Sequence, residues 1–563
     1  MTTDPSSPEE VFAALADPTS WNAIGYQPFP IGRPSDTPGP VQVPTVELQA
    51  ARDTYDFVVV GSGAGGGVAA RVLAESGASV LVIERGGWVE RDAPTMDHLR
   101  NHRLPLLGDG TSPAGHPRAI ARASGERLVE PADLAYHNNA IAIGGGTRMF
   151  GAQAWRFHPD DFRMATLYGV PPGSALADWP LGYDDVAPYY RKVEWDLGVA
   201  GDGDYPMPPF PPGEEDRLLL DAAARLGWST TRVPLLVNTR PRGGRAACVR
   251  CGFCVGFPCP VDAKNGTDVA ALPRAVALGA DLIAGAQVTR IANDGSVNVV
   301  AGGVARTFQA GRILLAAGAI ETARLLQVSG LGNDWVGDCL QGHTYAGALG
   351  RHDGIVTDGL GPGPAVATRE FSHHNEGVVG GGQLANDFVK LPALFHLLGL
   401  PPDAPRLGRA ALAEVEHWYR RTSHVWGPVQ EVPTRAAQVR LSASTDAVGV
   451  PIARLGGAQH PEDLRTAALL ADRSAAWLRE AGACTTWQIR PVRPQLSGGQ
   501  HQAGTARMSA APHLGATNTD GRVWGTDRVY VVDGSVHVTN GSANPVLTIM
   551  ALAWRTADHV AST

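Results

Sequence analysis

The segment that most constrains the fold is "DFVVVGSGAGGGVAARVLAESGASVLVIERGG", residues 56–87. Its apolar run at 57–60 is short and rich in β-branched residues, as expected of a buried parallel strand. Gly61, Gly63 and Gly66 then form a G-x-G-x-x-G pattern that leads into a helical pattern. The first glycine of this pattern makes a tight turn, the second lets the backbone approach a pyrophosphate, and the third lets helix and strand pack closely.

A second apolar run, residues 79–83, ends in Glu84, which is placed to accept hydrogen bonds from a ribose hydroxyl. The order strand, glycines, helix, strand, acid predicts a dinucleotide site, with the helix N-terminus directed at the phosphates. An acid at this position fits an unphosphorylated adenosine ribose. The segment therefore predicts FAD or NAD rather than NADP.

Composition excludes several functional classes. The chain has 563 residues, a net charge of −8 and only 18% charged residues, so it offers no basic surface for nucleic acid. No segment approaches the roughly 20 apolar residues of a membrane helix, and the first 21 residues lack the pattern of a secretion signal. Six cysteines in a chain of this size do not form a disulfide framework. We expect a cytoplasmic protein without a membrane or nucleic-acid partner.

Three later segments decide between the two cofactors. They are "NNAIAIGGGTRMFGAQAWRFHPDDF" (138–162), "GAIETARLLQVSGLG" (318–332) and "VVDGSVHVTNGSANPVLTIMALAWR" (531–555). Together with residues 56–87, in this order, they resemble the glucose–methanol–choline (GMC) family of FAD oxidoreductases. The resemblance spans most of the chain and implies FAD rather than NAD.

The resemblance also implies a fold and a division of the chain. Further strand patterns at 281–291, 312–320 and 528–536, and a helical pattern at 544–560, indicate a nucleotide fold assembled from separated segments. We expect an α/β fold, α+β overall, with a Rossmann-like FAD-binding domain and a substrate-binding domain that has an antiparallel sheet and helices. The expected divisions are a leader at 1–50, the FAD-binding domain at 51–170, 251–340 and 491–563, and the substrate-binding domain at 171–250 and 341–490.

The same resemblance implies which residues hold the flavin. They come from the glycine motif, the second glycine-rich segment, the central strands and the C-terminal segment. The expected set is Gly61, Gly63, Ala64, Gly66, Glu84, Arg85, Gly145, Gly146, Thr147, Met149, Gly151, Ala152, Val288, Ala317, Asp533, Gly534, Asn544 and Pro545.

Within the family, "DWPLGYDDVAPYYRKVE" (178–194), "HQAGTARM" (501–508) and "GSANP" (541–545) resemble pyranose oxidases and their bacterial C-glycoside 3-oxidase relatives. This likeness implies His501 and Asn544 as the catalytic pair. Fungal pyranose oxidases attach FAD through a histidine at the position where this chain has Met149. Since methionine cannot form that bond, we expect non-covalent FAD.

The chemistry of the two side chains fits alcohol oxidation. Neutral imidazole, with an ordinary pKa near 6.5, suits His501 as the base for the hydroxyl proton while hydride passes to flavin N5. The Asn544 amide cannot exchange a proton and would hydrogen-bond the same oxygen.

We expect oxidation of a ring hydroxyl, at C3 or C2, of a pyranose or glycoside, with electrons passed to O2, giving H2O2, or to a quinone-like acceptor. A steroid or long-chain alcohol is the alternative substrate. A flavin-binding protein without turnover is disfavoured because both catalytic residues are present.

The cysteine segment "CVRCGFCVGFPCP" leaves a second site open. Cys248, Cys251, Cys254 and Cys259 give C-x2-C-x2-C-x4-C-P, one residue from a bacterial iron–sulfur pattern, and four thiolates also suit zinc. Related flavoproteins have a comparable loop without a cluster, so we expect no metal. Four other histidines are candidates for supporting roles alone: His343, His373, His374 and His537.

Overall fold

The computed structural model describes residues 5–26, 40–91, 97–101, 104–105, 112–133, 135–137 and 139–563. Parts of the expected leader, 1–4 and 27–39, and the first residue of the segment 138–162 lie outside the described residues.

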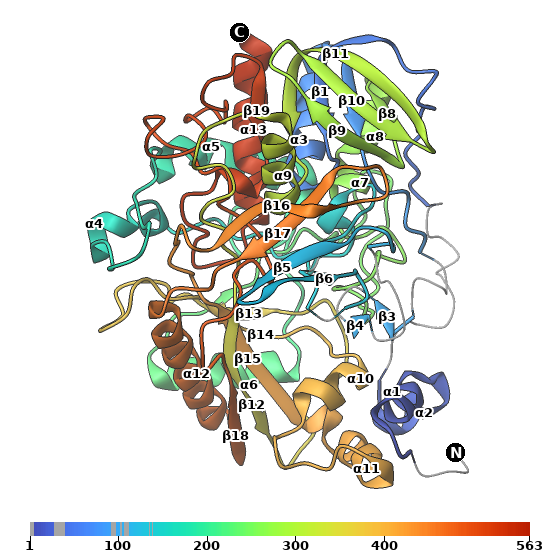
Figure 1. The fold of residues 1–563 in the computed structure, drawn as a ribbon. Helices are drawn as coiled ribbons and strands as arrows, with labels where there is room; N and C mark the ends of the chain where they lie inside the picture. The colour runs from blue at the N-terminus through green and yellow to red at the C-terminus, as the bar shows by residue number, and fades with distance from the viewer. Residues whose placement is uncertain are drawn as a thin grey trace.

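The first sheet has the order β8-β2-β1-β11-β10-β9, and β19 also pairs with β11 (Figure 1). Strands β8, β2, β1, β11 and β19 pair in parallel and form the centre of the sheet. Strands β10 and β9 pair antiparallel at one edge. The strands are β1 (Thr54–Val60), β2 (Val80–Ile83), β8 (Asp281–Ile283), β9 (Ala286–Ile291), β10 (Ser296–Ala301), β11 (Val304–Leu315) and β19 (Val529–Val531). The strand pattern at 281–291 is therefore two strands, divided at Gly285, whose φ is +65°.

Helix α3 packs on this sheet, and a stack of helices on it joins segments from both ends of the chain. The glycine motif leads into α3 (Ala64–Glu75), which packs against α13 (Val546–Ser562), and α13 also contacts α5 (Tyr183–Val193) (Figure 1). Both α3 and α13 bury apolar side chains along most of their length. The C-terminal helix thus completes the nucleotide fold, as the sequence predicts.

The glycines of the motif allow this close packing. Gly61 has φ +98°, and a Cβ atom on it would lie 2.4 Å from the carbonyl oxygen of Ala316. A Cβ atom on Gly66 would lie 2.0 Å from the carbonyl oxygen of Gly61. Any larger residue at 66 would push α3 away from the sheet.

The second sheet is antiparallel and has the order β18-β12-β15-β14-β13-β7. On it packs the long helix α12 (Glu462–Glu480), which contacts β12, β15 and α6 (Glu214–Leu226) (Figure 1). The strands are β7 (Thr231–Arg232), β12 (Tyr345–Arg351), β13 (Val366–Thr368), β14 (Leu384–Asn386), β15 (Thr422–Pro428) and β18 (Thr485–Ile489). This arrangement, beside the Rossmann-like sheet, confirms the expected fold class.

A third sheet, of order β16-β17-β5-β6, joins segments expected in different domains. It consists of β5 (Arg118–Arg122), β6 (Gly125–Val129), β16 (Gln438–Thr445) and β17 (Pro451–Gly456), and α9 (Ala319–Ser329) packs against it. The other elements are α1 (Pro8–Ala16), α2 (Pro18–Ile24), β3 (Arg100–Asn101), β4 (Leu104–Pro105), α4 (Met164–Tyr168), α7 (Thr267–Ala270), α8 (Leu272–Ala277), α10 (Pro392–Leu394) and α11 (Gly408–Trp418), with η2 (Gly145–Arg148), η3 (Pro159–Phe162), η4 (Glu194–Gly198), η5 (Phe395–Gly399), η6 (Tyr419–Arg421) and η7 (Gly534–Val536).

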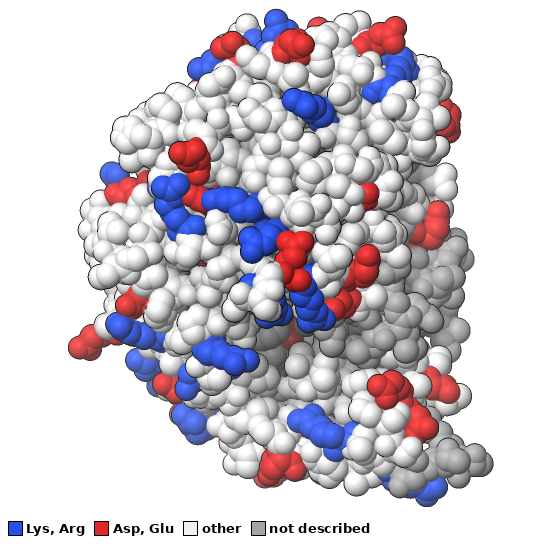
Figure 2. Space-filling model, viewed as in Figure 1, with Lys and Arg blue, Asp and Glu red and all other residues white. Residues whose placement is uncertain are grey.

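On the face drawn in Figure 2, basic and acidic side chains are interspersed, and no continuous basic surface forms. Within the described ranges, none of the helices combines the length and apolar character needed to span a membrane.

Candidate active site

Two adjoining cavities lie between the Rossmann-like sheet and the antiparallel sheet. The first opens where β1, β2 and β11 end, because Val60, Ile83 and Ala316 line it. This is where parallel sheets bind nucleotides. The second cavity reaches the antiparallel sheet, and Ala64 and Gly146 line both cavities. Together they form one elongated site.

Almost every predicted site residue lines this pair of cavities. Gly61, Gly63, Ala64, Glu84, Arg85, Gly145, Gly146, Val288, Ala317, Asp533 and Gly534 line the first. Ala64, Gly146, Thr147, Met149, Gly151, Ala152, His501, Asn544 and Pro545 line the second. Gly66 does not line either cavity and acts through helix packing.

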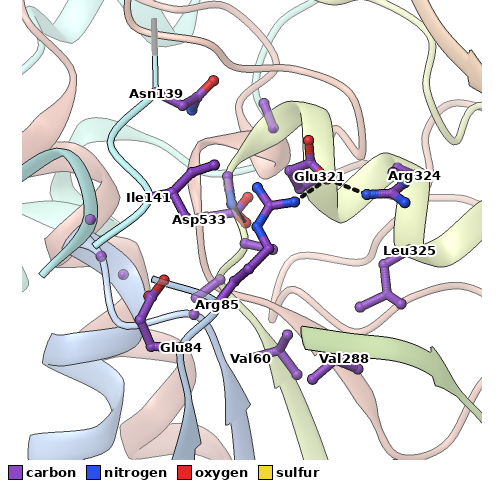
Figure 3. Close-up of a pocket in the computed structure, with 18 of the residues that line it drawn as sticks. Val60, Glu84, Arg85, Asn139, Ile141, Val288, Glu321, Arg324, Leu325 and Asp533 are labelled. Carbon is purple, nitrogen blue, oxygen red and sulfur yellow. Dashed lines mark hydrogen bonds and ion pairs between the residues drawn. The ribbon is translucent and has the colours of Figure 1, made fainter. Parts of the chain in front are cut away.

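Two charged side chains follow β2 at the edge of the first cavity (Figure 3). The Glu84 carboxylate accepts hydrogen bonds from the Ser62 hydroxyl at 2.6 Å, the Ser62 amide at 3.0 Å and the Gly86 amide at 2.8 Å. Burial raises the pKa of Glu84. Arg85 extends toward Glu321 on α9, with 3.4 Å between the paired atoms. Glu84 thus also holds the glycine turn in place, a role that the sequence did not predict.

Asp533 joins two distant segments of the chain at the first cavity. Its carboxylate accepts from the Gly318 amide at 2.9 Å, from the Thr322 hydroxyl at 2.6 Å and from the Ser535 amide at 2.8 Å. Burial raises the pKa of this carboxyl group. The C-terminal segment is thereby tied to the start of α9.

The first cavity fits a dinucleotide. Gly63 begins α3 without a side-chain cap, which leaves the first-turn N–H groups to the cavity. A Cβ atom on Gly63 would come no closer than 3.9 Å to another residue, and one on Gly146 would have no atom within 4 Å. Because neither glycine has a side chain, the cavity wall leaves room there for the pyrophosphate of a dinucleotide.

His501 and Asn544, separated by 43 residues, meet in the second cavity, with 3.3 Å between Nε2 of His501 and Nδ2 of Asn544. The amide is fixed on both sides: Gln383 donates to Oδ1 at 3.2 Å, and Nδ2 donates to the Tyr345 hydroxyl at 3.2 Å. Burial, and to a lesser extent the neighbouring His343, hold the pKa of His501 well below its usual value. The pair can therefore present a neutral imidazole and an amide donor to one oxygen atom.

Several residues of the second cavity were not predicted. They include Tyr345 from β12, Trp426 from β15, and the three amides Gln383, Gln500 and Gln502. Tyr345 and Trp426 pack together with ring centroids 4.8 Å apart. Gln500 and Gln502 flank His501 in the sequence, whereas Tyr345, Trp426 and Gln383 reach the site only through the folding of distant segments.

The cysteine loop lies against the second cavity. Val255 lines the cavity, and the Gly256 amide donates to the Met149 carbonyl at 2.8 Å. Lys264 supports the loop by donating to the carbonyl oxygens of Phe150, Cys254 and Phe257, at 2.7–3.0 Å. The four loop cysteines are free thiols, and burial raises the pKa values of Cys248, Cys251 and Cys254. In the described part of the chain, no three His, Cys, Asp or Glu side chains converge as a metal site.

The other histidines differ in their contacts. His373 lies 2.9 Å from Asp161, and His374 lies 2.8 Å from Asp160. His537 lies 3.2 Å from Asn540. Among these residues, His343 is the one hydrogen-bonded to His501.

Comparisons with known proteins identify the family of this chain. Residues 139–345 and 433–553 match the N- and C-terminal models of the GMC oxidoreductase family, and residues 59–98 match an NAD(P)-binding Rossmann-like domain. Paromamine 6'-oxidase of Streptomyces fradiae is 30% identical, over 90% of this chain and 91% of that protein. The fructose dehydrogenase large subunit of Gluconobacter japonicus is 26% identical, over 90% of this chain and 97% of that protein.

A solved structure shares the fold. Pyridoxine 4-oxidase from Mesorbium loti superposes with a TM-score of 0.60 at 18% identity and covers 90% of this chain and 98% of its own. The family models together match more than half of the chain, and the first relative matches nearly all of it. The chain therefore belongs to the GMC oxidoreductases, FAD-dependent enzymes that act on alcohol CH–OH groups.

Proposed function

We propose that the protein oxidises a secondary ring hydroxyl, at C3 or C2, of a pyranose sugar or glycoside to a keto-sugar. The observation that carries the proposal is the His501–Asn544 pair, which faces a cavity lined by the amides of Gln383, Gln500 and Gln502. Amide groups can donate to and accept from several hydroxyl groups of one ligand. These three amides suit a polyol better than a sterol or an alkyl chain.

The names of the relatives support a sugar-like substrate. Two are named for the aminoglycosides paromamine and paromomycin, and another for fructose. The aromatic face of Trp426 supplies an apolar surface for the C–H groups of a sugar ring. Polar and apolar groups together are what a small, hydroxylated ring requires.

Each catalytic side chain has one task in this proposal. Nε2 of His501 takes the hydroxyl proton, and Nδ2 of Asn544 donates a hydrogen bond to the same oxygen and stabilises its developing negative charge. Bound FAD supplies the hydride acceptor. Electrons then pass to O2 or to a quinone-like acceptor.

The proposed FAD is non-covalent, because Met149 cannot form a histidyl link. Denaturation followed by ultrafiltration should release all of the flavin into the filtrate. Flavin that stays with the precipitated chain would contradict this part of the proposal. Iron and zinc analysis of the same sample tests the cysteine loop, which we expect to hold no metal.

The main experiment is anaerobic flavin bleaching with a panel of free sugars, O-glycosides, C-glycosides, aminoglycosides, a sterol and a long-chain alcohol. We expect fast bleaching by a pyranose or glycoside, and NMR of the product should locate the carbonyl at C3 or C2. A carbonyl at C6 would contradict oxidation of a ring hydroxyl and would show that the exocyclic hydroxyl is the one oxidised. Bleaching by the sterol or the alkyl alcohol alone would refute the sugar assignment. Oxygen uptake against quinone reduction then identifies the acceptor.

A further inference from the structure

His343 is a buried histidine, 3% exposed, that lies two residues before β12. Its amide donates to the Gln500 carbonyl at 2.9 Å, so its segment runs beside the one that carries His501. The two imidazole rings meet nearly at a right angle, 79°, with centroids 5.1 Å apart. His343 thus contacts the ring of His501, the proposed base.

The hydrogen bonds of His343 fix where its own proton lies. Nε2 of His343 is 3.1 Å from the carbonyl oxygen of Gly541. A carbonyl oxygen only accepts, so Nε2 carries hydrogen. Burial lowers the pKa of His343 to about 4, which keeps the ring neutral and leaves a lone pair on Nδ1.

That lone pair determines the proton position on the next ring. Nδ1 of His343 lies 2.9 Å from Nδ1 of His501. Since the first nitrogen accepts, the second must donate, and His501 carries its proton on Nδ1. A neutral imidazole with hydrogen on Nδ1 has its lone pair on Nε2, the atom that lies beside Asn544.

The contacts of Asn544 lead independently to the same tautomer. Gln383 donates to Oδ1 of Asn544, which leaves the amide nitrogen turned toward Nε2 of His501 at 3.3 Å. An amide nitrogen only donates, so Nε2 must accept. Both neighbours of the His501 ring therefore require the same proton position.

We infer that His343 is a positioning residue for the reaction, which holds His501 in the Nδ1–H tautomer so that the Nε2 lone pair can accept the substrate proton once the substrate hydroxyl displaces the Asn544 amide from it. The inference rests on the proposed role of His501 as the base. His343 does not touch the substrate in this assignment. Its effect passes through one hydrogen bond.

The surrounding structure fixes the positions of the His343 and His501 backbones. Nδ2 of Asn540 donates to the His501 carbonyl at 2.7 Å and lies 3.5 Å from the Gly342 carbonyl. The Gly342 amide donates to the buried Glu431 carboxylate at 3.0 Å. His501 itself has φ +55°, a backbone conformation that a non-glycine residue keeps only where its surroundings impose it. Several hydrogen bonds therefore fix the backbone segments that carry His343 and His501.

A direct test is ¹⁵N NMR of the FAD-loaded enzyme labelled at histidine, with the His501 signals assigned by their loss in His501→Gln. We expect a protonated Nδ1 and an unprotonated Nε2 at pH 7. In His343→Asn, Oδ1 can take the place of the accepting nitrogen, and the same pattern should persist. In His343→Leu the acceptor is gone, and a protonated Nε2 should appear.

Kinetics provides the second measurement, with FAD affinity and substrate Kd as structural controls. We expect His343→Leu to slow anaerobic flavin reduction at least about tenfold, with an upper limit near the 10⁴-fold loss seen when a serine-protease histidine is held in the wrong tautomer. His343→Asn should restore most of the rate. FAD and substrate affinities should stay near those of the unmodified enzyme in both variants.

Several results would overturn the inference. A proton on Nε2 of His501 in the unmodified enzyme would do so, even if the leucine variant failed to fold. Equal loss of rate in the asparagine and leucine variants, or wild-type reduction in His343→Leu, would do the same. Failure of the proposed function is distinguishable, because then no sugar or alcohol bleaches the unmodified enzyme, while the NMR result remains valid.

Discussion

Replacing Gly63 and Gly66 separately by alanine tests two different physical roles within one motif. At Gly63 the new methyl group would come no closer than 3.9 Å to another residue, and the backbone angles there, φ −65° and ψ −159°, do not require glycine. The apo protein should therefore keep its stability. The methyl group would, however, stand in the cavity wall that faces the cofactor phosphates.

The cost at Gly63 should appear in FAD binding alone. A hydrogen bond to a charged group contributes about 1.5–3 kcal/mol. Losing one such bond to a phosphate oxygen should raise the Kd of FAD about 10- to 150-fold.

At Gly66 the methyl group would lie 2.0 Å from the Gly61 carbonyl oxygen and 2.9 Å from Cβ of Ala316. Overpacking of this kind costs about 1–3 kcal/mol, and the gain in helix propensity offsets up to about 1 kcal/mol. Because the closest contact is with the backbone, which cannot rotate away, we expect a net loss of about 2 kcal/mol in the stability of the apo protein.

The assay compares urea unfolding of the apo proteins, followed by tryptophan fluorescence, with FAD titration of each variant. Gly63→Ala should unfold like the parent protein and bind FAD weakly. Gly66→Ala should unfold at lower urea. Equal loss of apo stability in both variants, or wild-type FAD affinity in Gly63→Ala, would refute the division of roles.

Four further changes have defined outcomes. His501→Ala should retain FAD but slow anaerobic flavin reduction by about 10²–10⁴-fold, the usual effect of losing a general base; near-normal reduction would remove His501 from the mechanism. Since burial lowers the pKa of His501, the ring stays neutral and able to accept a proton well below pH 6.5, so reduction rates measured from pH 5 to 9 should show no inflection near 6.5. Glu84→Ala should weaken FAD binding in a fluorescence titration while the loaded fraction reacts normally, and unchanged affinity would argue against its role. Lys264→Met should leave the carbonyl groups of Phe150, Cys254 and Phe257 without their lysine donor and lower the free energy of unfolding by about 2 kcal/mol or more. Lys192→Met, at an exposed position, serves as the control and should change it little.

The sequence by itself determined the cofactor unit. A strand, three spaced glycines, a helix start and a terminal acid act within some thirty contiguous residues, and local backbone rules are strong over that range. Resemblance to a family added the C-terminal residues, including His501, Asn544 and Asp533, and all of them line the cavities. The sequence predicted the limits of the strands less well. Of the predicted strand at 528–536, only Val529–Val531 form β19, and Gly534–Val536 form the short helix η7.

Tertiary structure alone decided what surrounds the reacting atoms. Tyr345 and Trp426 reach the cavity from strands that pair across long stretches of chain, and Gln383 reaches it from the residue before β14. His343 meets His501 over a separation of 158 residues. Contacts of that range depend on how whole sheets and helices pack, which no short window of sequence contains. The proton position on His501 is a consequence of the same packing, because it follows from which atoms the fold places at 2.9 Å and 3.3 Å from its two ring nitrogens.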